Sequence, residues 1–229
     1  MLRDCPNPKI TVQFQDGDAL ISRSRSIRAT KFLKETKDDL LCFLDDDVSI
    51  SAIDYTKLMW LAYKEGLDIV GAAYATKSKT NPGFAVRPLQ GTDKLKFGNE
   101  GGVYEMKDIS SGCMVIRREV LEKMISSESV HLCTHGERQY YPFFQHREVE
   151  DDGVWEDKSE DWFFCYQARQ LGFKVWMDSS IRTGHTGAYE FDWSDVYETK
   201  AGLRKTYDNP IFNITVPSLN GNEAVKTAI

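Results

Sequence analysis

The chain has 229 residues, of which 41% are hydrophobic, and this suits one α/β domain with a sizeable core. Its formal net charge is −6 at pH 7, which disfavours nucleic acid as a partner because the overall field repels polyanions. We expect no transmembrane segment, because no run of about 18 apolar residues occurs, and the first residues lack the apolar core of a signal peptide. The five cysteines show no paired Cys-x-x-Cys spacing, which indicates reduced thiols and a cytoplasmic protein.

Strand and helix patterns alternate through the first part of the chain. Apolar periodicity predicts strands at Ile10–Phe14, Leu40–Leu44 and Leu67–Tyr74, of which the last two are buried. Helices are predicted between them, at Ala19–Lys34 and Ile53–Glu65. Such alternation favours parallel strands that are joined by right-handed crossovers. The sequence therefore predicts a mostly parallel central sheet.

The second part of the chain is less regular. A polar stretch with a short antiparallel excursion near 83–88 comes first, and two strand pieces are then predicted within Val103–Ile116. The pattern further predicts helices at Arg118–Ile125 and Glu160–Leu171 and a strand at Lys174–Met177. Ser126–Lys158 is long, polar and aromatic, without a clear period. A segment of that length in a compact domain is usually a mobile lid or an insertion.

Three consecutive carboxylates, Asp45, Asp46 and Asp47, follow the apolar run Leu40–Leu44. Ligand sites of open α/β sheets lie at this end of the strands. In an extended segment Asp45 and Asp47 would project to one side, where they could hold one cation such as Mg²⁺ or Mn²⁺. The alternative is a solvated turn or the N-cap of the following helix.

A second acidic pair, Glu160 and Asp161, stands at the start of a predicted helix and is followed by aromatic residues. A carboxylate held there could accept a proton from a hydroxyl group, although acids also pair favourably with a helix dipole in this position. His185 lies among small residues in the stretch RTGHTG. It could complete the coordination of a cation at Asp47, or it could be a buried structural histidine.

Basic and flexible residues accompany these acids. Arg25 and Arg28 fall on one side of the first predicted helix, where a guanidinium could pair with an aspartate or hold a diphosphate oxygen. A solvated basic face is the alternative. The stretch from Ser110 to Gly112 is either a tight bend between strands or a place where a ligand approaches the backbone closely.

The order of these motifs resembles glycosyltransferases of the GT-A fold, and compact family 2-like members from bacteria, phages and large viruses are the most similar. After the arginine-bearing helix the motifs are FLDDDV, VGAAYATK, SSGCMVIRREV, SEDWFFCYQARQLGFKVW and GHTG, and the resemblance spans roughly residues 10–189. It implies a Rossmann-like GT-A domain with a mostly parallel sheet over residues 1–207 and a tail over 208–229.

The resemblance also implies roles for individual residues. Asp45, Asp47 and His185 would bind Mn²⁺ or Mg²⁺, which bridges the diphosphate of a nucleotide-sugar donor, with a UDP-sugar favoured. Asp161, beside Glu160, would deprotonate the hydroxyl of a glycan or a similar acceptor. The donor side would be formed by Arg25, Asp45, Asp46, Lys77 and Gly112, and Lys205 could also assist the phosphates.

Two features depart from the family pattern. The acidic strand follows Ile10 too closely for the usual opening of a GT-A domain, so we expect the first βα unit to be missing. Residues 126–158 would form an acceptor lid whose aromatic side chains stack on sugar rings, namely Tyr140, Tyr141, Phe143, Phe144 and Trp155. Two other functions stay open: a haloacid-dehalogenase-like phosphatase with Asp45 as nucleophile, and a non-catalytic module that binds a nucleotide or carbohydrate.

Overall fold

The computed structural model describes residues 9–14, 18–80, 83–92, 94–187, 190–193, 195 and 211–213. The α-helices in this part are α1 (Ile21–Glu35), α2 (Ala52–Lys64), α3 (Arg118–Ser126) and α4 (Glu160–Gln170), and Gly98–Glu100 forms a 3₁₀ turn. All four α-helices were predicted from apolar periodicity to within a few residues. Ser51 caps α2, because its side chain accepts a hydrogen bond from the amide of Asp54 at 3.1 Å.

A six-stranded sheet forms the centre of the molecule, in the order β1-β7-β3-β12-β6-β4. Its strands are β1 (Leu40–Leu44), β3 (Ile69–Gly71), β4 (Val86–Pro88), β6 (Val103–Ile109), β7 (Cys113–Arg117) and β12 (Val175–Asp178). Only β3 and β12 pair in parallel within this sheet; the other neighbouring pairs are antiparallel.

The prediction of a mostly parallel sheet was therefore wrong. Strands β1 and β3 do run in the same direction, as the strand and helix alternation requires, but β7 lies between them and runs against both. Alternation along the chain sets the direction of successive strands. It does not reveal that a strand from later in the chain inserts between them.

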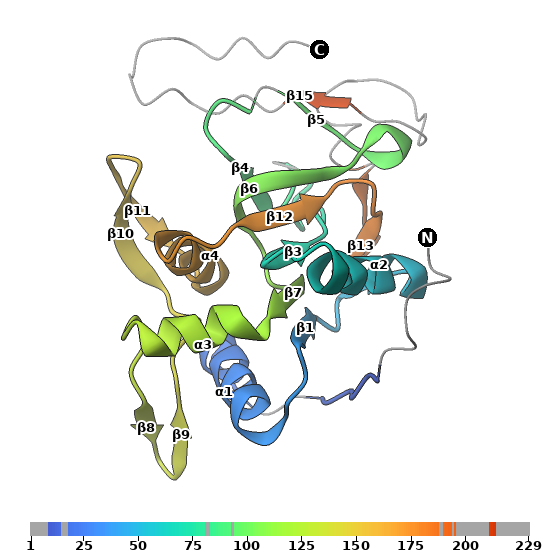
Figure 1. Ribbon diagram of the computed structural model, residues 1–229. Helices are drawn as coiled ribbons and strands as arrows, with labels where there is room; N and C mark the ends of the chain where they lie inside the picture. Colours follow the sequence, from blue (N-terminus) through green and yellow to red (C-terminus); the bar gives the residue numbers. More distant parts are fainter. Residues whose placement is uncertain are drawn as a thin grey trace.

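Helices cover both faces of the sheet. Helix α2 packs against β1, β3 and β7 on one face, while α3 and α4 pack on the other face, with α1 against α3 (Figure 1). Along β7, Met114 and Ile116 join the core beneath α1, α3 and α4, whereas Cys113 and Val115 join the core beneath α2. This alternation explains why β7 is apolar throughout.

The predicted first strand is not present. Residues 10–14 form no strand and lie outside the sheet, and the side chains of Ile10, Val12 and Phe14 are exposed (Figure 1). Their contact with the body comes from Arg28, whose Nη2 donates to the carbonyl oxygen of Phe14 at 2.6 Å. The apolar alternation was real, but a strand also needs a hydrogen-bonding neighbour.

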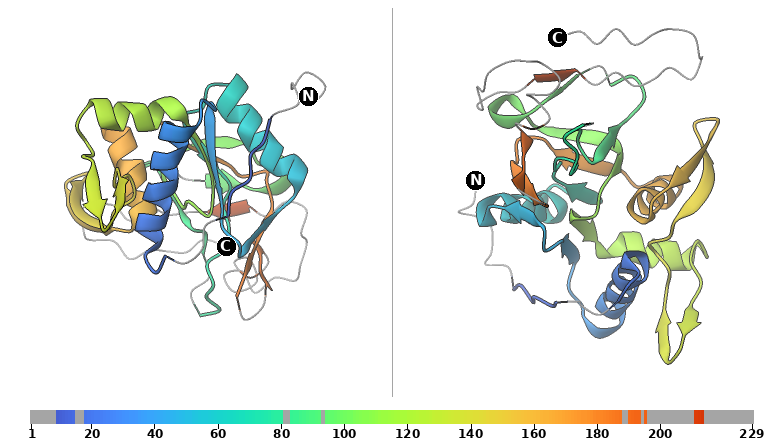
Figure 2. Two further views of the ribbon diagram at one scale, coloured as in Figure 1. Left: turned by 90° about the horizontal axis from the view of Figure 1, so that it is seen from below. Right: turned by 180° about the vertical axis from the view of Figure 1, so that it is seen from behind.

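Most of the segment 126–158, predicted as a lid, is ordered into two hairpins. They are β8 (Cys133–His135) with β9 (Arg138–Tyr140), and β10 (Arg147–Asp151) with β11 (Val154–Lys158), and both project from the body (Figure 2). Between them Phe143 and Phe144 are fully buried, and Phe144 stacks on Phe164 at a centroid distance of 4.5 Å. These two rings anchor the segment to the core and cannot stack on a sugar, whereas Trp155 is 72% exposed.

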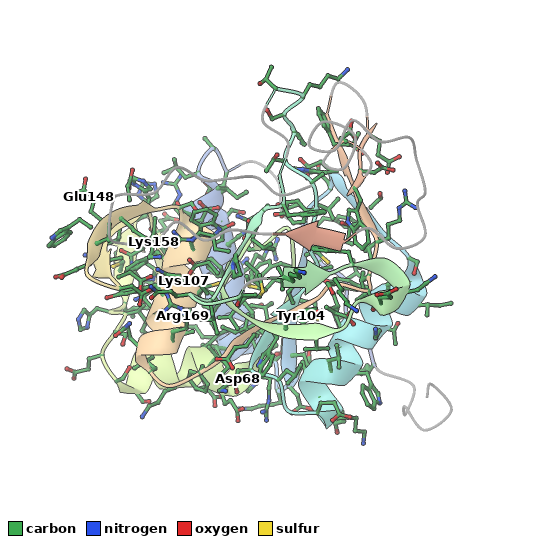
Figure 3. The ribbon with its side chains drawn as sticks, turned by 90° about the horizontal axis from the view of Figure 1, so that it is seen from above. Asp68, Tyr104, Lys107, Glu148, Lys158 and Arg169 are labelled. Atoms are coloured by element: carbon green, nitrogen blue, oxygen red, sulfur yellow. The ribbon has the colours of Figure 1, made fainter. Side chains whose placement is uncertain are left out.

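A buried cluster of charges fixes the second hairpin to α4. The ammonium of Lys158 is fully buried and lies 2.8 Å from both Asp151 Oδ2 and Glu156 Oε2. Arg169 of α4 also contacts Asp151 Oδ2 at 2.8 Å. Figure 3 shows Lys158, Lys107 and Arg169 gathered where the hairpin meets the helix. Lys158 precedes Glu160, the first residue of α4, by two positions, so the cluster lies beside the start of this helix.

Smaller sheets complete the described part. Strand β2 (Val48–Ile50) pairs with β13 (Thr183–Thr186), which pairs with β14 (Glu190–Phe191), and β5 (Lys94–Lys96) pairs with β15 (Ile211–Asn213). Of the expected tail over 208–229, only β15 lies within the described residues. Four cysteines are free thiols there, and no helix in the described ranges is long and apolar enough to cross a bilayer.

Candidate active site

The three aspartates after β1 lie in a turn. The amide of Val48 donates to the carbonyl oxygen of Asp45 at 3.1 Å and closes the turn, and the chain then enters β2. The prediction of an extended Asp45–Asp47 segment was wrong. Asp46 is exposed at this turn, while Asp45 and Asp47 are partly buried and contact different partners.

Asp47 meets His185, although the two residues are far apart in sequence. The pairing of β2 with β13 places His185 opposite Val48, and its Nε2 lies 3.7 Å from Asp47 Oδ2. The other ring nitrogen, Nδ1, lies 2.7 Å from the carbonyl oxygen of Ala75. A carbonyl can only accept, so Nδ1 donates its hydrogen to Ala75, and the tautomer that this fixes in the neutral imidazole leaves the Nε2 lone pair on the side of Asp47, where it could bind a metal.

This pair fits a divalent cation. Two ligands that each lie about 2.1 Å from one ion are about 3 to 4.2 Å apart, depending on the angle between them. The separation of Asp47 Oδ2 and His185 Nε2 falls within that range. Within the described ranges, no group of three or more His, Cys, Asp or Glu side chains is gathered for a metal. The structure shows Asp45 in contact with Arg25, and its role as a third ligand stays a prediction. The remaining ligands would be water and substrate oxygens.

Arg25 holds Asp45 instead. Its Nη2 lies 2.9 and 2.6 Å from the two carboxylate oxygens of Asp45, and its Nη1 lies 2.7 Å from Glu160 Oε1. The guanidinium is buried, so it joins the aspartate turn to the first residue of α4. The neighbouring arginines lie outside this site, because Arg23 pairs with Asp18 and Arg28 binds residues 13 and 14.

Lys77 is the second cation at the aspartate turn. Its Nζ lies 2.5 Å from Asp47 Oδ2, the same oxygen that faces His185. Both carboxylates that were predicted as metal ligands therefore have a side-chain cation of their own. Lys205, which was predicted to assist the phosphates, lies outside the described residues.

Asp161 is oriented by hydrogen bonds on both of its oxygens. Oδ1 accepts from Ser159 Oγ at 2.5 Å and from the amide of Trp162 at 2.8 Å. Oδ2 lies 3.4 Å from the amide of Ser111. These bonds leave the partly buried carboxylate in one orientation beside the bend at 110–112.

The same bend contacts the aspartate turn. The carbonyl oxygen of Gly112 accepts from the amide of Asp45 at 2.9 Å, while the amide of Gly112 donates to the hydroxyl of Tyr74 at 3.2 Å. The structure confirms that this stretch is a tight bend between β6 and β7, and the atoms that approach Gly112 closely are those of Tyr74 and Asp45, so the approach of a ligand to this backbone stays a prediction. Through Ser111 and Gly112, the bend joins Asp45 to Asp161.

Burial shifts the pKa of two groups in this site. It raises the pKa of Glu160, and the charge of Asp161 raises it further, while Arg25 acts in the opposite direction. Burial likewise raises the pKa of Tyr74 well above its usual value, with added contributions from Asp161 and Asp45. The phenol of Tyr74 therefore stays protonated at neutral pH.

Tyr74 was missed by the sequence reasoning, which assigned it to the end of an ordinary buried strand. Its ring lies edge-on to His185, with centroids 4.8 Å apart, and its hydroxyl reaches Gly112. The available signal was a phenol at the end of an otherwise aliphatic run, where a buried hydroxyl needs a hydrogen-bond partner.

Comparisons with known proteins add little. No protein-family model and no curated protein sequence matches the chain. Among solved structures, the crystal structure of A197 from STIV is similar, with 23% sequence identity and a TM-score of 0.47 over 74% of this chain and 69% of that chain. A likeness at this level assigns no function.

Proposed function

We propose that the protein is a metal-dependent glycosyltransferase that moves a sugar from a nucleotide-diphosphate donor, with a UDP-sugar favoured, to a hydroxyl group of a glycan or a similar acceptor. One observation carries the proposal: the bend at Ser111 and Gly112 touches both Asp45 and Asp161. Residues suited to a cation and a diphosphate therefore lie next to a carboxylate suited to proton transfer, as sugar transfer to a hydroxyl requires.

Each residue has a defined task in this scheme. A cation held by Asp47 and His185 would offset the charge that develops on the leaving diphosphate. Asp161 accepts the proton of the acceptor hydroxyl, and its hydrogen bonds keep the carboxylate aimed in one direction. Arg25 and Lys77 bring positive charge to the donor side, and Glu160 orients Arg25 through the contact at 2.7 Å.

The contacts of Asp45 favour this scheme over a phosphatase. A nucleophilic aspartate needs a carboxylate oxygen that is free to attack phosphorus. In the structure both oxygens of Asp45 contact Arg25, which suits a residue that positions a guanidinium.

Thermal unfolding with UDP, GDP, CDP and dTDP, each with and without Mn²⁺, tests the donor site in the wild type and in Asp47→Ala. A nucleotide at 100 times its Kd should stabilise the protein by about 2.7 kcal/mol. We expect one nucleotide to stabilise the wild type only when Mn²⁺ is present, and to leave Asp47→Ala unchanged. Absence of stabilisation by every nucleotide would reject the proposal.

Transfer from the corresponding nucleotide-sugar then tests catalysis. Loss of one group that stabilises the leaving diphosphate costs on the order of 10² to 10³ in turnover, so Asp47→Ala should be nearly inactive. Turnover equal to wild type in metal-controlled buffer would reject the assignment. Nucleotide binding without any turnover would favour the binding module, and a phosphoaspartate trapped on Asp45 would favour the phosphatase.

A further inference from the structure

Asp47 Oδ2 lies close to a lysine ammonium and to a histidine nitrogen. Lys77 Nζ lies 2.5 Å from this oxygen, and His185 Nε2 lies 3.7 Å from it. A cation bound to the oxygen at about 2.1 Å could lie no more than about 4.6 Å from the ammonium. At that separation the two positive charges repel each other, so the cation and Lys77 do not favour the same carboxylate together.

Packing directs the lysine to this position. Gly187, just after β13, leaves room for the stem of Lys77, because a Cβ on this glycine would lie 3.2 Å from the lysine Cδ and 3.1 Å from the ring of Phe191. The side chain is still about one third exposed, so its ammonium can turn toward solvent or toward a bound anion. It is guided to Asp47 but is not enclosed there.

We infer that Lys77 is a built-in counter-ion that holds the Asp47 site without metal and couples metal binding to diphosphate binding. A metal that enters alone must displace the ammonium, which then has no partner. When a diphosphate is also bound, the displaced ammonium gains the phosphate oxygens as partners. Metal and nucleotide diphosphate therefore each strengthen the binding of the other, beyond the contact of the metal with the phosphates themselves.

This inference rests on the proposed function, and its test needs no turnover. Mn²⁺ affinity is measured from the free Mn²⁺ signal in electron paramagnetic resonance, with and without UDP, for the wild type, Lys77→Met, Lys77→Gln and Lys123→Met. Lys123 is exposed on α3 and serves as the matched control. Because Lys77 is partly exposed, both of its variants should fold, and their unfolding temperatures verify this.

We expect both Lys77 variants to bind Mn²⁺ alone about tenfold more tightly than the wild type, a factor that lies within the range of roughly 5- to 150-fold usual for coupled sites. Addition of UDP should increase the Mn²⁺ affinity of these variants less than it increases that of the wild type. Lys123→Met should behave as wild type. Unchanged or weaker Mn²⁺ binding by the Lys77 variants, with binding and transfer intact in the wild type, overturns this inference alone. Absence of Mn²⁺ binding in every protein, with or without UDP, overturns the proposed function as well.

Discussion

The amide of Gly112 donates a hydrogen bond to the hydroxyl of Tyr74 at 3.2 Å, and the space between the two residues admits no side chain. A Cβ on Gly112 would lie 2.6 Å from the Tyr74 oxygen and 3.1 Å from Asp45 Oδ2. The glycine is required by this close approach of side chains to the backbone. It keeps the bend at 110–112 in contact with the aspartate turn.

Gly112→Ala should therefore destabilise the protein and reduce any transfer activity. The added methyl group must push Tyr74 or Asp45 aside, which typically costs about 1–3 kcal/mol for overpacking in a filled site. Urea unfolding measures the loss. Gly102→Ala is the control, because a Cβ there meets no atom within 4 Å, and an equal loss in both variants would contradict the explanation.

Arg25→Met should destabilise the fold because it leaves two partly buried carboxylates, Asp45 and Glu160, without their cation. Both carboxylates keep some solvent contact, so we expect a loss of about 2 kcal/mol, below the cost of breaking a fully buried pair. A double-mutant cycle with Glu160→Gln checks the cause. The double variant should lose about 1 kcal/mol less unfolding free energy than the two single variants lose in total. If the losses simply add, the contact between Arg25 and Glu160 contributes nothing.

The pH dependence of stability should reveal Glu160. Its pKa is raised above the ordinary value of 4.5, chiefly by burial, so the folded protein keeps this proton at a pH where the unfolded chain has released it. Stability is therefore lost as pH rises from about 4.5 through the folded pKa. Relative to wild type, Glu160→Gln should therefore gain stability in urea unfolding as pH rises from about 4.5 through the folded pKa of Glu160. If Glu160→Gln instead loses stability relative to wild type as pH rises, the charge of Arg25 lowers the pKa of Glu160 by more than burial raises it.

Asp161→Asn should separate catalysis from binding. The variant loses the proton acceptor, so turnover should fall by about 10² to 10⁴, while the Kd for UDP with Mn²⁺ stays close to wild type. Steady-state kinetics and calorimetry measure the two quantities. Asp157→Asn is the matched control on the exposed face of β11. A large change in nucleotide affinity in Asp161→Asn would place Asp161 on the donor side instead.

Two aromatic residues from the predicted lid should behave differently. Phe144→Ala removes a fully buried ring that stacks on Phe164 and should cost about 3–5 kcal/mol of unfolding free energy. Trp155→Ala should change stability by less than about 0.5 kcal/mol, because its side chain is 72% exposed. If Trp155 stacks on an acceptor sugar, its loss raises the acceptor KM. An unchanged KM removes that role.

The sequence by itself determined the helices and the types of residue in the site. Apolar periodicity located α1, α2, α3 and α4, because each helix buries one stripe of side chains and therefore has apolar residues at every third or fourth position. The acids at 45–47 and 160–161 stood out because charges directly after an apolar run must face solvent, a cation or a base.

The tertiary structure decided which residues meet. The insertion of β7 between β1 and β3, the pairing that brings His185 to Asp47, and the contacts of Arg25 with Asp45 and Glu160 all join distant parts of the chain. Local patterns report only how each segment buries its own apolar surface. Which segments become neighbours depends on how the whole chain satisfies its hydrogen bonds and fills its core at once, and that information is spread over the entire sequence.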